Sequence, residues 1–134
     1  MDAQLQAAVR RRAQGRCEYC LFPEALARLP FQIDHIIARK HGGVASPDNL
    51  AWSCLYCNSY KGSNLSGIDP DTGALVRLFH PRKDAWTEHF RWEVALLVGR
   101  TPIGRATIEV LRINDPDAIA VRASLIQEGV FPQS

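Results

Sequence analysis

The sequence predicts an α+β protein of short strands and short helices, and three observations lead to this fold class. The chain has 134 residues, of which 46% are hydrophobic, and this suffices for one domain with its own core. Brief runs of aromatic and β-branched residues alternate with amphipathic stretches that begin at capping residues. All the cysteines fall into two pairs of identical spacing, which indicates a metal site that joins distant parts of the chain. We therefore expect one domain over residues 1–134.

The first half of the chain is expected to alternate between helices and strands. Leu5, Val9 and Ala13 are spaced to line one side of a helix, and Gly15 follows where this helix should end. The segment FQIDHI is rich in residues that favour strands, and the Gly-Gly and Ser-Pro pairs after it are typical of a long loop. The predicted elements are a helix at 3–14, strands at 31–36 and 50–54, and a helix at 55–61.

The second half is expected to form a supporting α+β extension, a hairpin plus helices, over residues 63–134. Residues 62–73 have the composition of a loop, and ALVRLFH alternates as a strand does. Thr101 before Pro102 and Asp115 before Pro116 are signatures of helix starts. The predicted elements are a strand at 74–80, a helical turn at 84–88, a hairpin within 89–99, and helices at 102–112 and 116–128.

Basic residues gather at two places although the net charge of the chain is small. A net charge of +2 does not by itself indicate nucleic-acid binding. Arg39, Lys40 and His41 follow the central Asp-His pair. Two basic clusters around one candidate site favour phosphate contact about as much as a solvated basic face. The cluster that precedes the first cysteine consists of Arg10, Arg11, Arg12 and Arg16.

The sequence has neither the pattern of a signal peptide nor that of a membrane span. The N-terminal residues contain an early acid and no apolar run, so we expect no signal peptide. The longest apolar stretch, residues 94–98, is too short to cross a bilayer. We expect a cytoplasmic protein, in which thiols stay reduced and paired cysteines serve as metal ligands.

Cys17 and Cys20 form one cysteine pair, and Cys54 and Cys57 form the other. A two-residue gap lets both thiolates of a pair face one ion, and two pairs complete a tetrahedron. Four cysteine ligands leave no open position for water, so we expect the zinc to be structural. Four buried cysteines without metal are the plain alternative. A redox pair would be expected next to a βαβ pattern that the sequence lacks, and Ile37 stands where a zinc deaminase needs glutamate.

The segment between and around the cysteine pairs resembles a known family of nucleases. The order CxxC, Asp-His-Ile, Gly-Gly, Asn-Leu and CxxCNxxK is similar to that of HNH endonucleases of the zinc-clamped kind. The resemblance covers residues 17–62, about a third of the chain, and includes several independent elements in the right order. It implies a ββα-metal core (a His-Me finger), in which two strands, a loop and a helix surround one divalent ion. We expect this core, with its zinc knuckles, within residues 15–62.

The resemblance also implies a role for each matching residue. His35 matches the general base of the family, and Asp34 matches the acidic metal ligand before it. Asn49 matches the asparagine that braces the loop behind the histidine. Asn58 matches the last metal ligand, so the site is expected to contain Asp34, His35, Asn49 and Asn58.

The chemistry of these residues suits a DNA endonuclease that uses Mg²⁺ or Mn²⁺. His35 titrates near neutral pH and can accept a proton from water. Oxygen ligands from Asp34 and Asn58 favour Mg²⁺ or Mn²⁺ over zinc. Neighbouring residues of a strand point to opposite faces, so Asp34 and His35 reach one site only where the strand ends or is distorted.

Duplex DNA is the expected partner, and contacts with its phosphates are expected from Arg39, Lys40 and Lys61. For Lys61 the alternative is that it simply ends its helix. One alternative is a zinc module that binds nucleic acid without cutting it. Another is a zinc-stabilised domain that binds protein. Only the nuclease requires the aspartate, the histidine and the last asparagine together.

Overall fold

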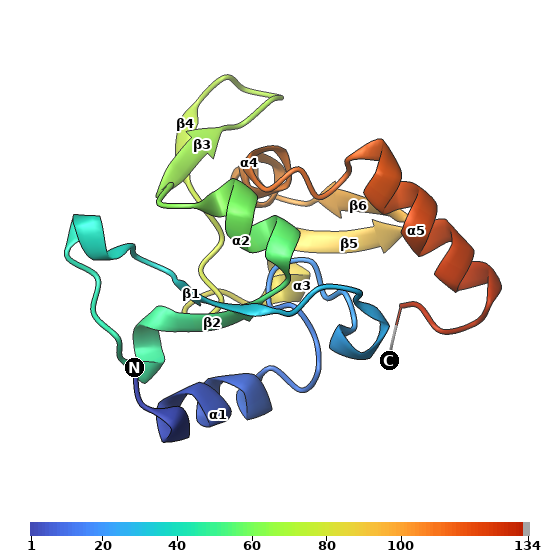
Figure 1. The fold of residues 1–134 in the computed structure, drawn as a ribbon. Coiled ribbons are helices and arrows are strands. Elements are labelled where there is room, and N and C mark those ends of the chain that lie inside the picture. Colours follow the sequence, from blue (N-terminus) through green and yellow to red (C-terminus); the bar gives the residue numbers. More distant parts are fainter. Residues whose placement is uncertain (133–134) are drawn as a thin grey trace. The chain divides into compact units, whose positions relative to one another are not determined.

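The computed structural model describes residues 1–132, and the chain divides into two compact units (Figure 1). Unit 1 comprises residues 1–64 together with 80–83, and unit 2 comprises residues 65–79 together with the described residues from Asp84 onward. All the site residues predicted from the sequence lie in unit 1. That residues 1–134 act as one domain stays a prediction.

Unit 1 consists of a β-hairpin with one helix against each of its strands (Figure 1). Strands β1 and β2 pair antiparallel, with Asp34 opposite Ala51 and His35 opposite Leu50. Helix α1 packs against β2, and helix α2 packs against β1. The elements are α1 (Ala3–Arg12), β1 (Gln32–His35), β2 (Leu50–Ser53) and α2 (Leu55–Lys61), with single 3-10 turns at Glu24–Leu26, Arg39–His41 and Pro47–Asn49.

Helix α1 has a capped start and one buried side. The Asp2 carboxylate accepts a hydrogen bond from the backbone N of Leu5 at 2.7 Å, which satisfies a free donor of the first turn. Val9 is buried on this helix, and Ala13, its C-cap, is buried as well. The helix ends at Arg12, two residues before the predicted end, because Gln14 and Gly15 adopt positive φ angles of 55° and 76°.

Helix α2 begins at the second cysteine pair. Cys54 has extended backbone angles, and its Sγ accepts a hydrogen bond from the backbone N of Cys57 at 3.4 Å. The helix ends at Gly62, whose φ of 50° suits a residue without a side chain. The order strand, strand, helix expected for residues 31–61 is therefore present in unit 1.

Unit 2 contains two hairpins that both contact helix α4. Thr101 caps this helix by accepting a hydrogen bond from the backbone N of Gly104 at 3.0 Å, and Pro102 follows at the first helical position. Strand β3 pairs with β4, and β5 pairs with β6. The elements are β3 (Ser66–Ile68), β4 (Leu75–Arg77), α3 (Trp86–His89), β5 (Phe90–Glu93), β6 (Leu96–Gly99), α4 (Pro102–Val110) and α5 (Pro116–Gln127).

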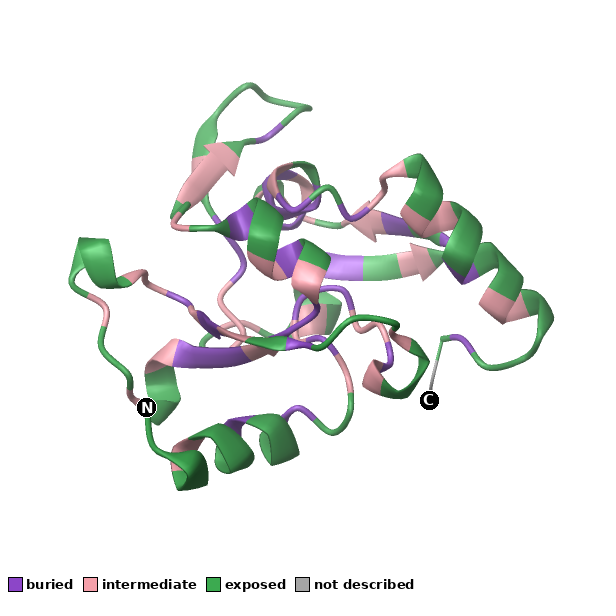
Figure 2. Ribbon diagram, in the orientation of Figure 1, coloured by how far each residue is buried: buried purple, intermediate pink, exposed green. Residues whose placement is uncertain are grey.

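A buried arginine ties helix α5 to the rest of unit 2. Most of α5 is exposed (Figure 2), but Arg122 is only 4% exposed. Its guanidinium donates to the carbonyl oxygens of Ala95 and Ile113 at 2.9 and 3.0 Å. The buried apolar side chains of unit 2 include Phe79, Phe90, Leu97 and Leu111.

The mixed helix and strand composition predicted from the sequence is confirmed, with one corrected segment. The composition of residues 62–73 predicts a loop, but they contain β3, in which Gly67 lies opposite Val76 of β4. This strand contains a serine and a glycine, so its pairing with β4 rather than its own composition determines it. Among residues 1–132, no helix is long and apolar enough to span a membrane.

Candidate functional site

The four cysteines converge on one point in unit 1. Cys17 and Cys20 lie just after α1, whereas Cys54 and Cys57 lie at the start of α2. All four side chains are buried and free of disulfides, and their Sγ atoms lie within 4.8 Å of one another. The Sγ atoms of Cys20 and Cys54 are 3.8 Å apart. The fold thus joins the two pairs into a single cluster.

This cluster is compatible with a structural zinc ion. A tetrahedral site with Zn–S bonds of about 2.3 Å requires sulfur atoms about 3.8 Å apart, which matches the Cys20–Cys54 separation. Hydrogen bonding to Cys17 raises the pKa of both Cys20 and Cys57 well above the ordinary value. Several thiolates in one buried cluster are therefore unfavourable unless a cation compensates them, and a zinc ion supplies that charge.

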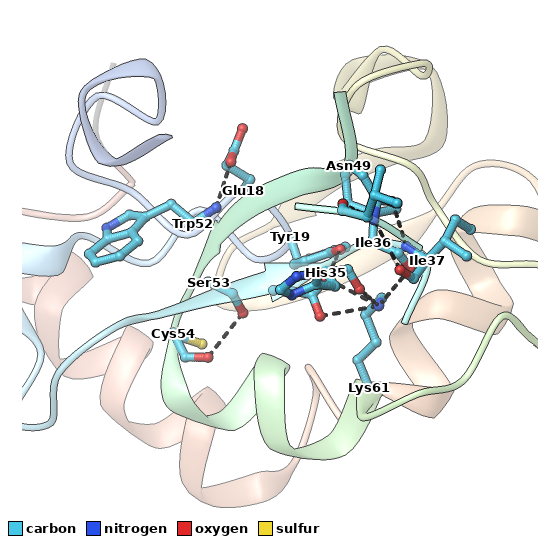
Figure 3. A network of polar contacts seen from close by, with 12 residues as sticks. Glu18, Tyr19, His35, Ile36, Ile37, Asn49, Trp52, Ser53, Cys54 and Lys61 are labelled. Atoms are coloured by element: carbon cyan, nitrogen blue, oxygen red, sulfur yellow. Dashed lines mark hydrogen bonds and ion pairs between the residues drawn. The ribbon is translucent and has the colours of Figure 1, made fainter. Parts of the chain in front are cut away.

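The first cysteine pair is also hydrogen-bonded to the hairpin. The backbone N of Glu18 donates to the carbonyl of Trp52 at 2.9 Å, and the Glu18 carboxylate accepts from the backbone N of Trp52 at 2.7 Å (Figure 3). The same carboxylate forms an ion pair with Arg82. These bonds fix the loop that contains Cys17 and Cys20 against β2.

Asp34 lies in a buried polar network on β1. Its carboxylate accepts a hydrogen bond from the Tyr19 hydroxyl at 2.6 Å. The Lys61 ammonium lies 3.2 Å from one carboxylate oxygen and 3.1 Å from the other. Asp34 is 4% exposed, Lys61 2% and Tyr19 0%. The Asp34 charge is thus already balanced by a cation of the protein itself.

In this structure the Asp34 carboxylate, predicted to be a metal ligand, is paired with a lysine. Burial raises the pKa of Asp34, while the Lys61 charge and the Tyr19 hydrogen bond act in the opposite direction and favour the carboxylate. Both carboxylate oxygens already contact the Lys61 ammonium. A divalent ion bound to Asp34 would share this carboxylate with Lys61 or displace the ammonium, and ligation by Asp34 stays a prediction.

His35 is the half-exposed neighbour of Asp34 at the end of β1. The regular pairing of β1 with β2 places side chains of adjacent residues on alternate faces. Arg39, on the turn after β1, directs Nε toward Nε2 of His35 at 3.4 Å. Partial burial and the Arg39 charge lower the pKa of His35. The imidazole is therefore neutral at pH 7 and can accept a proton.

Asn49 holds the loop that follows His35. Its side-chain oxygen accepts a hydrogen bond from the backbone N of Ile37 at 2.8 Å. Its side-chain nitrogen donates to the carbonyl oxygen of Ile37 at 3.0 Å (Figure 3). It also donates to the carbonyl oxygen of Val44 at 3.0 Å. These are the contacts expected of a bracing residue, and a contribution of Asn49 to catalysis stays a prediction.

Asn58 lies on α2, one turn before Lys61 and on the helix that packs against β1. Its side chain is half-buried and makes no hydrogen bond to any other part of residues 1–132. An amide oxygen that accepts no hydrogen bond from the described residues can serve as a ligand of a hard divalent ion. For Asn58, as for Asp34, ligation of that ion stays a prediction.

Of the basic residues predicted to contact phosphate, some are exposed and others are hydrogen-bonded within unit 1. Arg39 and Lys40 are exposed on the turn after β1, so they can reach a ligand. Lys61 is buried and its ammonium is hydrogen-bonded inside unit 1, an arrangement that does not favour the predicted phosphate contact. In the first cluster, Arg12 donates to the carbonyl oxygen of Leu50 at 2.6 Å, which gives it a structural role.

Sequence reasoning missed Tyr19 as a member of the site. It lies between the first two cysteines, and the only sequence signal is an aromatic residue with a hydroxyl in a segment that should be buried. The ion pair of Glu18 with Arg82 was missed as well, because Arg82 is distant in the sequence and returns to unit 1 in the segment 80–83.

The fold and the site together define a class of protein. A paired β-hairpin followed by a helix carries an Asp-His pair on its first strand, and a four-cysteine cluster compatible with zinc ties its ends. Comparison with known families agrees, because residues 17–64 match the family model of the HNH endonucleases. Over residues 17–64 the chain is therefore similar to the HNH endonucleases. Comparison with curated proteins gave no match, and comparison with solved structures gave none either.

Proposed function

We propose that this protein is an endonuclease that hydrolyses DNA phosphodiester bonds at His35. The observation that carries the proposal is a half-exposed histidine at a strand end, inside a segment that matches the HNH endonucleases, and partial burial lowers the pKa of this histidine. A general base must be accessible to water and unprotonated near neutral pH, and His35 meets both conditions.

Each proposed step uses a residue of unit 1. Nε2 of His35 takes the proton from the attacking water, and Arg39 and Lys40 bind the phosphates beside the cleaved bond. The contact from Arg39 to His35 is long at 3.4 Å and lies at the surface. It is therefore weak, and Arg39 can leave the imidazole when a phosphate offers two oxygens to its guanidinium.

The proposal includes a divalent ion, Mg²⁺ or Mn²⁺, with Asn58 as one side chain that would hold it. Such an ion stabilises the charge that develops on the phosphate and on the leaving oxygen. Mg²⁺ commonly keeps several waters and binds through one or two carboxylates and substrate phosphates, so the substrate phosphate and the Asp34 carboxylate would have to complete a site that includes Asn58. The zinc at the cysteines would have a separate, structural role.

One observation favours a second function, a zinc module that binds nucleic acid without cutting it. The Asp34 carboxylate, expected to ligate the divalent ion, is held by Lys61 instead. A module that only binds DNA would keep the cysteines, Arg39 and Lys40 and would have no use for a proton acceptor at His35. The two functions differ in whether the protein changes the substrate.

The test is nicking of supercoiled plasmid by the zinc-loaded full chain with Mg²⁺ or Mn²⁺. We expect cleavage by the wild type and loss of cleavage in EDTA. His35→Ala should lower the rate by roughly 10²–10⁴-fold, since that is what a general base contributes. His41→Ala is the matched control, because His41 is an exposed histidine on the turn after β1, and this variant should cut at close to the wild-type rate.

The outcomes separate the two functions. Equal cleavage by the wild type and His35→Ala would remove His35 from the mechanism. Binding of duplex DNA that weakens with salt, without cleavage under any metal condition, would establish the binding module in place of the nuclease.

A further inference from the structure

We propose that Lys61 is the positioning residue for His35: its buried ammonium fixes the backbone at the end of β1, and Asp34 and Tyr19 hold that ammonium in place. This inference rests on the proposed function, because it assigns a role within the same site. It assigns a function to Lys61, a buried lysine that takes no direct part in the proposed hydrolysis.

The ammonium of Lys61 is surrounded by acceptors from β1. It donates to the carbonyl oxygens of His35 at 3.3 Å and Ile36 at 3.0 Å (Figure 3). It also contacts both carboxylate oxygens of Asp34, at 3.1 and 3.2 Å. A lysine has three N–H donors, so these acceptors satisfy all of them and leave no capacity for another ligand.

Asp34 and Tyr19 explain why a charged lysine can lie in this interior. A buried ammonium is unfavourable unless an opposite charge and hydrogen bonds compensate it, and Asp34 supplies that charge. The Tyr19 hydroxyl donates to the same carboxylate at 2.6 Å and fixes its orientation. Tyr19 is itself anchored between Cys17 and Cys20, so the cysteine cluster is linked to the lysine through two side chains.

The backbone after β1 is held from a second direction as well. The backbone N of Ile36 donates to the carbonyl of Asn49 at 2.9 Å, and the backbone N of Ile37 donates to the Asn49 side chain at 2.8 Å. Lys61 donates hydrogen bonds to the carbonyl oxygens of His35 and Ile36. Both the backbone N–H groups and the backbone carbonyl groups next to His35 are therefore held in place. A general base displaced by about 1 Å can lose about 100-fold in rate, so this restraint matters for catalysis.

Lys40 provides a comparison within the same chain. It is exposed on the turn that follows β1, where a phosphate can reach it, whereas Lys61 is 2% exposed. Removal of a phosphate contact weakens substrate binding, whereas removal of a positioning contact lowers the rate of the bound complex. Replacement of Lys40 should therefore change mainly KM, whereas replacement of Lys61 should change mainly kcat.

The experiment compares Lys61→Met with Lys40→Met in the zinc-loaded full chain. We expect Lys61→Met to lower kcat for plasmid nicking by about 10- to 100-fold with KM changed by less than about twofold. Lys40→Met should raise KM and leave kcat at the wild-type level. The proposal would be overturned if Lys61→Met raised KM alone, because that is the result expected when a phosphate contact is removed.

A second readout does not depend on cleavage. The ring nitrogen signals of His35, measured by NMR without DNA and assigned with His35→Ala, should shift or broaden in Lys61→Met and stay unchanged in Lys40→Met. Unchanged ring signals in a folded, zinc-containing Lys61→Met protein would overturn the proposal. A wild-type protein that does not nick would refute the proposed function, and the NMR comparison would still decide the role of Lys61.

Tyr19→Phe keeps the test decisive if Lys61→Met does not fold. This variant removes one hydrogen bond to Asp34 and leaves the ion pair with Lys61 intact. We expect the same His35 signals to move, by a smaller amount, and kcat to fall severalfold. A folded Tyr19→Phe protein with wild-type His35 signals would contradict the proposal when Lys61→Met cannot be studied.

Discussion

Lys40 and Lys61 carry the same side chain within unit 1, yet their surroundings give them different capacities. The exposed Lys40 can bind a phosphate, whereas Lys61 is enclosed by Asp34 and two backbone carbonyls. The spacing CNxxK indicates that Lys61 ends a helix but not which way its ammonium points. The direction follows from the packing of α2 against β1, which joins residues distant in the sequence.

Gly43 is the residue at which the loop after His35 closely approaches the backbone that follows β1. A Cβ atom at Gly43 would lie 1.7 Å from the carbonyl oxygen of Ile37 and 2.9 Å from the side-chain nitrogen of Asn49. We predict that Gly43→Ala lowers the free energy of unfolding by about 2–3 kcal/mol, as overpacking of a fixed backbone does. It should also lower the nicking rate, because it disturbs the Asn49 brace.

The matched control for this prediction is the adjacent glycine. Gly42 has a φ of 90°, and a Cβ atom there would have no neighbour within 4 Å, so Gly42→Ala meets backbone strain alone. That strain costs about 1 kcal/mol. Urea unfolding of the two variants checks the difference, and an equal or smaller loss for Gly43→Ala would show that the loop is not tightly held.

At the scale of elements, the cysteine cluster joins the start of α2 to the loop that follows α1. Each strand of the β1–β2 hairpin has only four residues, and such a hairpin is marginally stable by itself. The metal ion would supply the missing free energy, because a site present only in the folded chain stabilises that state.

We predict that Cys17→Ser loses the zinc and unfolds unit 1. Metal analysis should find about one zinc per wild-type chain and far less in the variant. The loss of a structural zinc exceeds the few kcal/mol by which a small domain is stable, so thermal unfolding of unit 1 should shift to much lower temperature. An unchanged zinc content and melting curve in Cys17→Ser would contradict the zinc site.

The sequence predicted those parts of the fold and site that depend on local signals. The cysteine spacing, the capping residues Thr101 and Asp115, and the Asp-His pair at a strand end are patterns of a few residues each. The strand β3 and the contacts of Asp34 with Tyr19 and Lys61 depend instead on pairing across the chain. A sequence shows that Asp34 is suited to bind a cation but not which cation is nearest.

At the scale of the whole molecule, each unit has its own buried polar anchors. In unit 2, the Arg105 guanidinium donates to Asp69 at 2.8 and 3.0 Å, and this hydrogen bonding lowers the pKa of Asp69. In unit 1, Lys61 and Asp34 form the corresponding pair. The residues proposed for catalysis all belong to unit 1, so we assign the chemistry to this unit.

The most direct test of His35 as the general base is the single-turnover rate of DNA nicking, measured against pH for the wild type and His35→Ala. Because the pKa of His35 is lowered, its neutral form persists to lower pH, so the wild-type rate should rise with pH and level off with a midpoint below 6.5. The residual rate of His35→Ala should lack this rise. The same rise in both proteins, or a plateau of equal height, would contradict His35 as the base.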